Sequence, residues 1–435
     1  MLLLPSRSIW RSARSYATHA SSTITTNQSN SGIKVLASED ESKLTSSISV
    51  FIKAGSRYEP SPGLAHALKN MVFKATDKRS ALSVVREAEL LGGVLTSSLT
   101  REHLILSAEF IKGNEGYFSE ILGDVLTRSK YLAHEFKEET IPALAAEYHQ
   151  AHLDSTVVAL DLAHQVAFRK GLGNSLFANP QIPIAHDSAV QYARSAFSSS
   201  NQHLVIGTGV ESSELTKLVN QFFSSSTASK ISSAFPQSSN SKYFGGESRL
   251  AAHLPNTFLI AFQGGANVSK PEFTVLQHVL GSYPSSVKWS QGISPLSSVP
   301  VRSFHLPYSD TGLFGFIVKA SGAEAKTAGS RALAELKNVA SGNGIDQDSV
   351  GRAIKKAQFL VASGLENNFH RSEILGSVSL ASKSTPQQLQ ELYSSYGQVT
   401  PDKVIEAAKT AIGSRPSTVA VGNVHELPYV EDLGL

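Results

Sequence analysis

The feature of this sequence that most constrains its fold is an internal duplication, in which one series of elements occurs twice in 435 residues. Each copy opens with a β-branched run, a glycine-containing turn and a helical pattern, at residues 46–73 and 256–281. Paired strands, two helical segments and a final helix-strand unit follow in the same order. The helical segments fall at 117–126 and 137–154 in the first copy and at 323–339 and 346–368 in the second, and the final units at 188–210 and 402–424. This self-similarity predicts two copies of one structural module.

A serine-rich stretch at residues 224–242 separates the copies and has the composition of an extended linker. Strands and helices come in blocks and not in strict β-α-β alternation, which predicts an α+β fold made of two homologous α/β sandwich domains. We expect the N-terminal domain at residues 17–223 and the C-terminal domain at residues 243–435. Two domains joined in this way could close on each other like a clamshell.

The first 16 residues are predicted to be a mitochondrial presequence. They are rich in serine and arginine and contain no acidic residue. On a helix, one face would carry the three arginines of this segment, Arg7, Arg11 and Arg14, which is the basic amphipathic pattern of a transit peptide. Arg14 stands two residues before a tyrosine that a small residue follows, and this predicts cleavage between Tyr16 and Ala17. The alternative is a basic terminus without a targeting role.

Composition excludes several classes of function. The chain has no cysteine, so it forms no disulfide and holds no cysteine-ligated zinc or iron–sulfur cluster. Its formal net charge of +3 equals the contribution of the three presequence arginines, and no basic cluster with interleaved aromatic residues suggests nucleic-acid binding. No apolar run reaches the roughly 20 residues of a membrane-spanning helix, so we expect membrane association through partner proteins only.

The segment GLAHALKNMVFKAT, at residues 63–76, has the pattern of a metal-binding helix with two positions changed. Ser61 as the cap and Pro62 in the first turn predict a helix that continues to position 73. Residues 66 and 70 would then share one face. In an H-x-x-E-H helix, two such histidines bind zinc and the glutamate acts as general base. Here Lys69 and Asn70 replace the glutamate and the second histidine.

Together with GGESR at residues 245–249 and YSDTGLFGF at residues 308–316, this segment resembles the pitrilysin/mitochondrial-processing-peptidase family. The similarity extends over essentially the whole mature chain. The resemblance implies a fold of duplicated α+β halves and a further zinc-ligating carboxylate at Glu147. His66 and Glu147 therefore match the family's metal site, whereas Lys69 and Asn70 do not.

The changed positions predict that the chain is not an active peptidase and binds neither a metal nor another cofactor. At about 4 Å and an effective dielectric constant near 20, an ammonium at position 69 would be repelled by Zn²⁺ by roughly 8 kcal/mol. Two remaining ligands do not form a zinc site. Active members also resemble one another in an arginine and a tyrosine from the second half, and the matching stretch here places Lys288 and Pro295 at those positions.

Other candidate positions have simpler interpretations. His149 and His152 lie beside Glu147, but a solvated helix face is favoured over a metal pair because no further ligands are near in sequence. His103 is interpreted as a surface residue at a strand edge, and QGGA at residues 263–266 as a turn without a complete phosphate-loop pattern.

The family contains two kinds of non-catalytic member. One is the substrate-binding α subunit of the mitochondrial processing peptidase, which carries a glycine-rich loop; the other comprises the core subunits of respiratory complex III, ubiquinol–cytochrome c reductase. The stretch that corresponds to the loop, residues 279–292, has only Gly281 and Gly292. The resemblance therefore favours a structural core subunit, with the α subunit as the alternative. A further hypothesis is that the cavity of such a protein binds presequence peptides without cleaving them.

A core subunit implies a set of partners and a location. It would pair as a heterodimer with the first core subunit and support cytochrome b, cytochrome c1 and the iron–sulfur subunit. It would lie peripherally on the matrix side of the mitochondrial inner membrane. Its role in electron transport would be to support the assembly and architecture of the complex.

Overall fold

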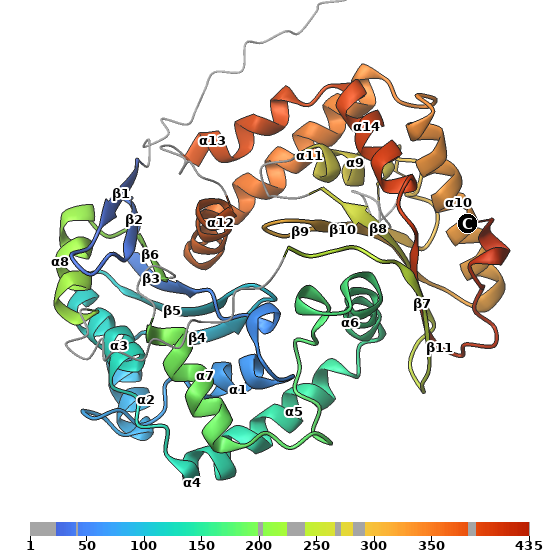
Figure 1. Ribbon diagram of the computed structural model, residues 1–435. Helices are drawn as coiled ribbons and strands as arrows, with labels where there is room; N and C mark the ends of the chain where they lie inside the picture. Colours follow the sequence, from blue (N-terminus) through green and yellow to red (C-terminus); the bar gives the residue numbers. More distant parts are fainter. Residues whose placement is uncertain are drawn as a thin grey trace, which may run out of the picture.

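The computed structural model describes residues 23–40, 42–198, 203–223, 240–265, 271–281, 292–381 and 389–434. The predicted presequence, with its cleavage position between Tyr16 and Ala17, lies outside the described residues, as does most of the predicted linker at 224–242. The chain folds into two β-sheets that are covered by helices (Figure 1).

The first sheet has six strands within the described residues, in the order β1-β2-β6-β3-β5-β4. Their bounds are Ile24–Gln28 (β1), Lys34–Ser38 (β2), Thr45–Ile52 (β3), Val94–Leu99 (β4), Leu104–Ile111 (β5) and His203–Thr208 (β6). Strands β2 and β6 run parallel and all other neighbours run antiparallel. Val50 of β3 thus lies between Leu106 of β5 and Val205 of β6.

The second sheet repeats this arrangement. In the described part of the chain it has five strands, in the order β7-β11-β8-β10-β9, and only β7 and β11 run parallel. Their bounds are Gly246–Ala251 (β7), Thr257–Gly264 (β8), Val301–Pro307 (β9), Gly312–Lys319 (β10) and Ser417–Gly422 (β11). This order matches β2-β6-β3-β5-β4 strand for strand, which confirms the predicted α+β duplication; β1 is an additional strand.

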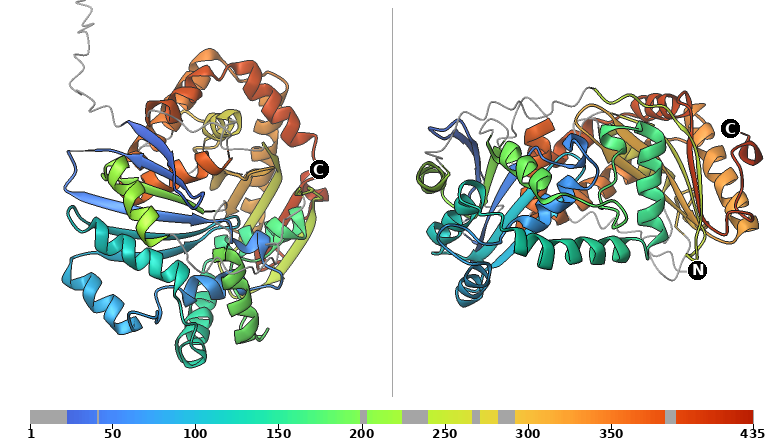
Figure 2. Two further views of the ribbon diagram at one scale, coloured as in Figure 1. Left: turned by 60° about the vertical axis from the view of Figure 1, so that its left-hand side comes forward. Right: turned by 60° about the horizontal axis from the view of Figure 1, so that its bottom comes forward.

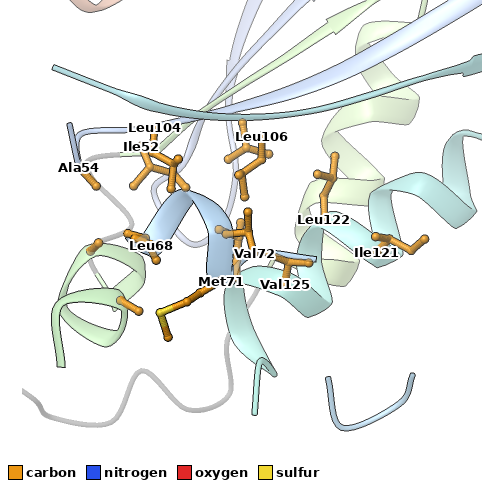
Figure 3. Packing of buried hydrophobic residues seen from close by; sticks show 14 of the residues in the cluster. Ile52, Ala54, Leu68, Met71, Val72, Leu104, Leu106, Ile121, Leu122 and Val125 are labelled. Carbon is orange, nitrogen blue, oxygen red and sulfur yellow. The ribbon is translucent and has the colours of Figure 1, made fainter. Parts of the chain in front are cut away.

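Helices of each half form a core with one face of their own sheet. In the first half these are α1 (Leu64–Met71), α2 (Ala81–Leu90), α3 (Glu115–Thr127), α7 (His186–Ser198) and α8 (Ser212–Phe222). In the second half they are α9 (Pro271–Leu280), α10 (Gly322–Ala340), α11 (Gln347–Glu366), α13 (Leu389–Ser394) and α14 (Pro401–Ile412). Figure 3 shows the first of these cores, where Leu68 and Val72 lie under Leu104 and Leu106 of the sheet.

Short elements complete the chain. They are the 3-10 helices Ser56–Tyr58, Gly171–Gly173, Ser395–Gln398 and Glu431–Leu433, and a continuous stretch formed by α4 (Ala133–Glu135), a π-helical turn (Phe136–Thr140) and α5 (Ile141–Ala151).

The start of α1 differs from the prediction. The cap is Gly63 and not Ser61, and Pro62 lies before the helix instead of in its first turn. The φ of +88° at Gly63 is a left-handed conformation that glycine adopts without strain. The buried carboxyl group of Glu59 satisfies the helix start by accepting a hydrogen bond from the Ala65 N–H at 3.0 Å. The helix ends at Met71, before Phe73 with its φ of +58°, and not at position 73 as predicted.

The two halves exchange one helix each. Helix α6 (Ser155–Phe168), from the first half, packs on β8 and β11 of the second sheet, where Ala163 lies among buried residues such as Leu259 and Val419. Helix α12 (Asn368–Ala381), from the second half, packs on β3 and β6 of the first sheet. The right-hand view of Figure 2 follows the chain from α5 into α6, which stands against the strands of the second sheet. The domain boundaries predicted near residues 17, 223 and 243 stay a prediction. The cores do not follow them strictly, because α6 and α12 each pack on the sheet of the other half.

A buried ion-pair network joins the halves near the middle of the molecule. Arg57, which is 6% exposed, donates from Nη1 to Glu102 Oε1 at 2.8 Å and binds Asp310 with two hydrogen bonds of 2.8 and 2.6 Å. Glu102 also accepts from the Ser309 N–H, and Asp310 from the Ser241 N–H. We call Arg57, Glu102, Ser309 and Asp310 the seam network. Because its members come from both halves, it holds them in one relative position.

Candidate functional site

The predicted site residues do come together, although 77 positions separate Asn70 from Glu147. Helix α1 carries His66, Lys69 and Asn70, and α5, which contacts α1, carries Glu147. One carboxylate oxygen, Oε2 of Glu147, is 2.6 Å from His66 Nε2 and 2.7 Å from Lys69 Nζ. Asn70 Nδ2 is 3.5 Å from the same oxygen. The four family positions therefore still form one cluster.

The hydrogen bonds of His66 determine where its proton is. The ring is 2% exposed, and its Nδ1 accepts a hydrogen bond from the Ala178 N–H at 3.0 Å. A neutral imidazole with Nδ1 as acceptor carries its hydrogen on Nε2. Nε2 therefore donates to Glu147 and has no lone pair to offer a metal. The neighbouring Phe177 meets the ring edge-on and restricts its orientation.

The Lys69 ammonium supplies the positive charge that a metal would supply in an active relative. The hydrogen bond from His66, followed by that from Lys69 and its charge, lowers the pKa of Glu147 to about 2 despite partial burial. Glu147 is therefore ionised at neutral pH and paired with an internal cation. Its side chain is 35% exposed and that of Lys69 22% exposed, so the pair is a partly solvated one.

The residues of this cluster do not fit zinc. Of the four positions, only His66 and Glu147 are of metal-ligating type, and both already bind each other. Over the described residues, no group of three or more histidine, cysteine, aspartate or glutamate side chains could hold a metal ion. Two further positions match the arginine and tyrosine that active members carry in the second half. Lys288 lies outside the described residues, and the Pro295 carbonyl accepts a hydrogen bond from Arg331.

The three other histidines considered in the sequence analysis lie in two different surroundings. His149 is exposed, and Nδ1 of His152 donates to the Tyr148 carbonyl at 2.8 Å, so both belong to a helix face as interpreted from the sequence. His103, interpreted from the sequence as a surface residue at a strand edge, is partly exposed and directly precedes β5, and its side chain lines a cavity. Burial lowers the pKa of His103 to about 4, so the ring is neutral at pH 7.

Sequence reasoning missed the contacts made by two of the motifs. The YSDTGLFGF segment supplies Asp310 to the seam network, and its Tyr308 hydroxyl donates to His164 Nε2 of α6 at 2.7 Å. In GGESR, Arg249 donates to the carbonyls of Leu427 and Pro428 and lies over the Tyr429 ring. The motifs were conspicuous in the sequence, but their partners lie about 145 to 250 positions away or at the other end of the chain.

Two homologous α+β halves and a His66–Glu147 pair beneath the first sheet define a protein of the zinc-metallopeptidase class whose metal centre is degenerate. The chain belongs to peptidase family M16: residues 34–180 match the model described as Insulinase (Peptidase family M16), and residues 183–357 match the Peptidase M16 inactive domain. The family resemblance read from the motifs is thus confirmed.

Three similar proteins share one name. The chain is 39% identical to the Cytochrome b-c1 complex subunit 2, mitochondrial, of Cryptococcus neoformans var. grubii, with 93% of both chains covered. It is 37% identical to the protein of that name from Neurospora crassa, over 93% of this chain and 90% of the relative. The mouse protein of the same name is 29% identical, with 92% and 90% covered. In the part of the chain that the structure describes, no helix has the length and apolar character needed to cross a bilayer.

Proposed function

We propose that this chain is the second core subunit of mitochondrial ubiquinol–cytochrome c reductase, respiratory complex III, and acts as a non-catalytic structural subunit. The observation that carries the proposal is the pairing of Glu147 with Lys69 and His66, which occupies the family's metal ligands in a chain similar to subunits of that complex. The length of 435 residues and the loss of two motif positions favour the second core subunit over the first.

A structural role also agrees with the way the halves are joined. Helices α6 and α12 each bury apolar residues against the opposite sheet, and the seam network adds buried charges between them. Such a chain presents its outer surfaces in a constant arrangement, which suits the docking of several partners. We propose that the partners are the first core subunit, as a heterodimer, together with cytochrome b, cytochrome c1 and the iron–sulfur subunit.

We further propose a peripheral position on the matrix side of the inner membrane, reached after removal of residues 1–16. Attachment would be through the partners. The role in electron transfer from ubiquinol to cytochrome c is then indirect, through assembly and stability of the complex. N-terminal sequencing of the mature protein tests the presequence; an intact Met1 would contradict cleavage between Tyr16 and Ala17.

Affinity purification from mitochondria tests the function. A tag at the C-terminus of the full chain, with solubilisation in a mild detergent, is expected to recover cytochrome b, cytochrome c1, the iron–sulfur protein and the first core subunit in stoichiometric amounts. Deletion of the chain should lower the amount of assembled complex III. Recovery of a catalytic processing-peptidase subunit alone would instead support the α-subunit alternative.

The hypothesis of peptide binding without cleavage has a specific obstacle in the structure. Strand β4 is an edge strand beside α1, linked to it by a hydrogen bond from Ser97 Oγ to the Lys69 carbonyl, and an extended peptide could add to such an edge. The nearby Lys69 ammonium neutralises Glu147, which weakens attraction for a basic presequence. Saturable binding of a presequence peptide to the purified heterodimer would nevertheless favour this hypothesis.

A further inference from the structure

A cavity of about 610 Å³ lies between the halves, on the face of the first sheet opposite to α1. Its apolar wall is formed by Phe51 and Ile105 of the sheet, Ile374 and Leu380 of α12, and Pro307 at the end of β9. Side chains alternate across a strand, and the neighbours Ile52 and Leu104 pack against α1 on the other face of the sheet, as Figure 3 shows. The cavity is therefore separated from the His66–Glu147 cluster by the sheet itself.

Most polar groups around the cavity are already satisfied within the described residues. Arg101 binds Asp161 and the Leu172 carbonyl, and Glu102 belongs to the seam network. Glu373 accepts a hydrogen bond from His370, and Ser377 Oγ donates to the Ile374 carbonyl. These groups shape the wall and leave little polar capacity for a ligand.

Two groups differ. The Lys53 side chain is exposed, and its ammonium lies 5.1 Å from the centre of the Tyr58 ring but forms no ion pair with an acidic side chain of the described residues. The His103 imidazole lines the same cavity and makes no hydrogen bond through its ring nitrogens to any described residue. One cation and one neutral ring that can donate a hydrogen bond thus adjoin the apolar part of the wall, and the other polar groups of the lining are already bonded to protein groups.

We propose that this cavity binds an apolar chain that ends in a carboxylate, with a medium-chain fatty acid as the ligand class. The carboxylate would pair with Lys53 and accept a hydrogen bond from His103, and the chain would lie along Phe51, Ile105 and Ile374. The cavity's volume is within the range of about 300–1,000 Å³ that is usual for small-molecule sites. A sugar would leave its hydroxyls against apolar side chains.

The site is independent of the proposed function, because it uses neither the degenerate metal cluster nor any partner subunit. A charge-assisted hydrogen bond from the exposed Lys53 contributes enough that its loss should weaken binding about tenfold. A polar side chain at position 374 should weaken it by a similar factor, because it opposes burial of the apolar chain.

The test uses the full purified chain and titrates decanoate below its micellar concentration by calorimetry. We expect saturable binding of one decanoate per chain, decanol to bind about tenfold more weakly, and acetate not to bind. Lys53→Met and Ile374→Gln should each reduce affinity about tenfold, whereas Lys355→Met, which removes an exposed positive charge on α11, should leave it unchanged.

Hydrogen exchange of the unmodified chain gives a second measurement that does not depend on variants. Decanoate should slow amide exchange in residues 100–105 and 373–380 and leave α1 unaffected. Absence of saturable binding, equal affinity for decanoate and decanol, or protection at α1 in place of the cavity would each overturn the proposal. Tighter binding of a peptide with an apolar C-terminal residue than of decanoate would also reject the fatty-acid assignment.

Discussion

Asp310→Asn tests whether the seam network joins the two halves energetically. The substitution keeps the size of the side chain but removes the charge that Arg57 binds through two nitrogens. Burial opposes ionisation of Asp310, but the hydrogen bond and charge of Arg57 outweigh it and hold the pKa of this carboxyl below its usual range. The native carboxylate is therefore charged at neutral pH, and the variant leaves part of the Arg57 charge uncompensated.

The expected magnitude follows from the burial of the pair. Removal of one partner from a buried ion pair costs about 3–5 kcal/mol, because the other charge stays buried. Two features reduce this value: Arg57 keeps Glu102 at 2.8 Å, and the Asp310 side chain is 20% exposed. We therefore expect the free energy of unfolding to fall by about 2–3 kcal/mol.

Urea unfolding followed by circular dichroism measures this change. Asp432→Asn is the matched control, because Asp432 pairs with Lys326 at an exposed position and should affect stability much less. In hydrogen exchange, Asp310→Asn should also speed exchange in both α6 and α12, since the seam holds the sheets that these helices cover. An Asp310→Asn variant as stable as the control, with unchanged exchange in both helices, would refute the reasoning.

Four further results are expected from the degenerate site and its surroundings. The purified chain should contain no stoichiometric zinc, whereas the double substitution Lys69→Glu and Asn70→His should gain it, as measured by elemental analysis, because it restores the family's ligands around Glu147. Lys69→Met should destabilise the protein at pH 7 by less than about 1 kcal/mol, since the pair is partly solvated, and the difference should vanish as the pH falls toward 2, where Glu147 becomes protonated. Burial raises the pKa of Glu59 to about 8, so the folded state binds its proton more tightly than the unfolded state; stability should fall as the pH rises from about 4.5 to 8, and Glu59→Gln should reduce this slope in urea titrations. Arg249→Ala should increase protease cleavage of the C-terminal segment, because Arg249 binds two of its carbonyls.

Much of the fold could be predicted because its signals are local. Runs of β-branched residues indicated strands, and the duplication indicated that the second sheet repeats the first. The motif also predicted that His66 and Glu147 belong to one site, and the two side chains are in contact. The start of α1 was less predictable: Gly63 and the Glu59 carboxyl group replace a serine-proline start that fits the local pattern equally well.

The sequence by itself determined that the chain is a duplicated α+β protein and that its metal site is degenerate, because periodicity and residue identity at fixed spacing carry that information. It did not predict α6 or α12, nor that each would cover the opposite sheet. It also left the partners of Asp310, the proton position on His66 and the cavity beside Lys53 open. These features depend on contacts between residues that are often more than 100 positions apart, and packing of buried surfaces, not local pattern, decides which of them form.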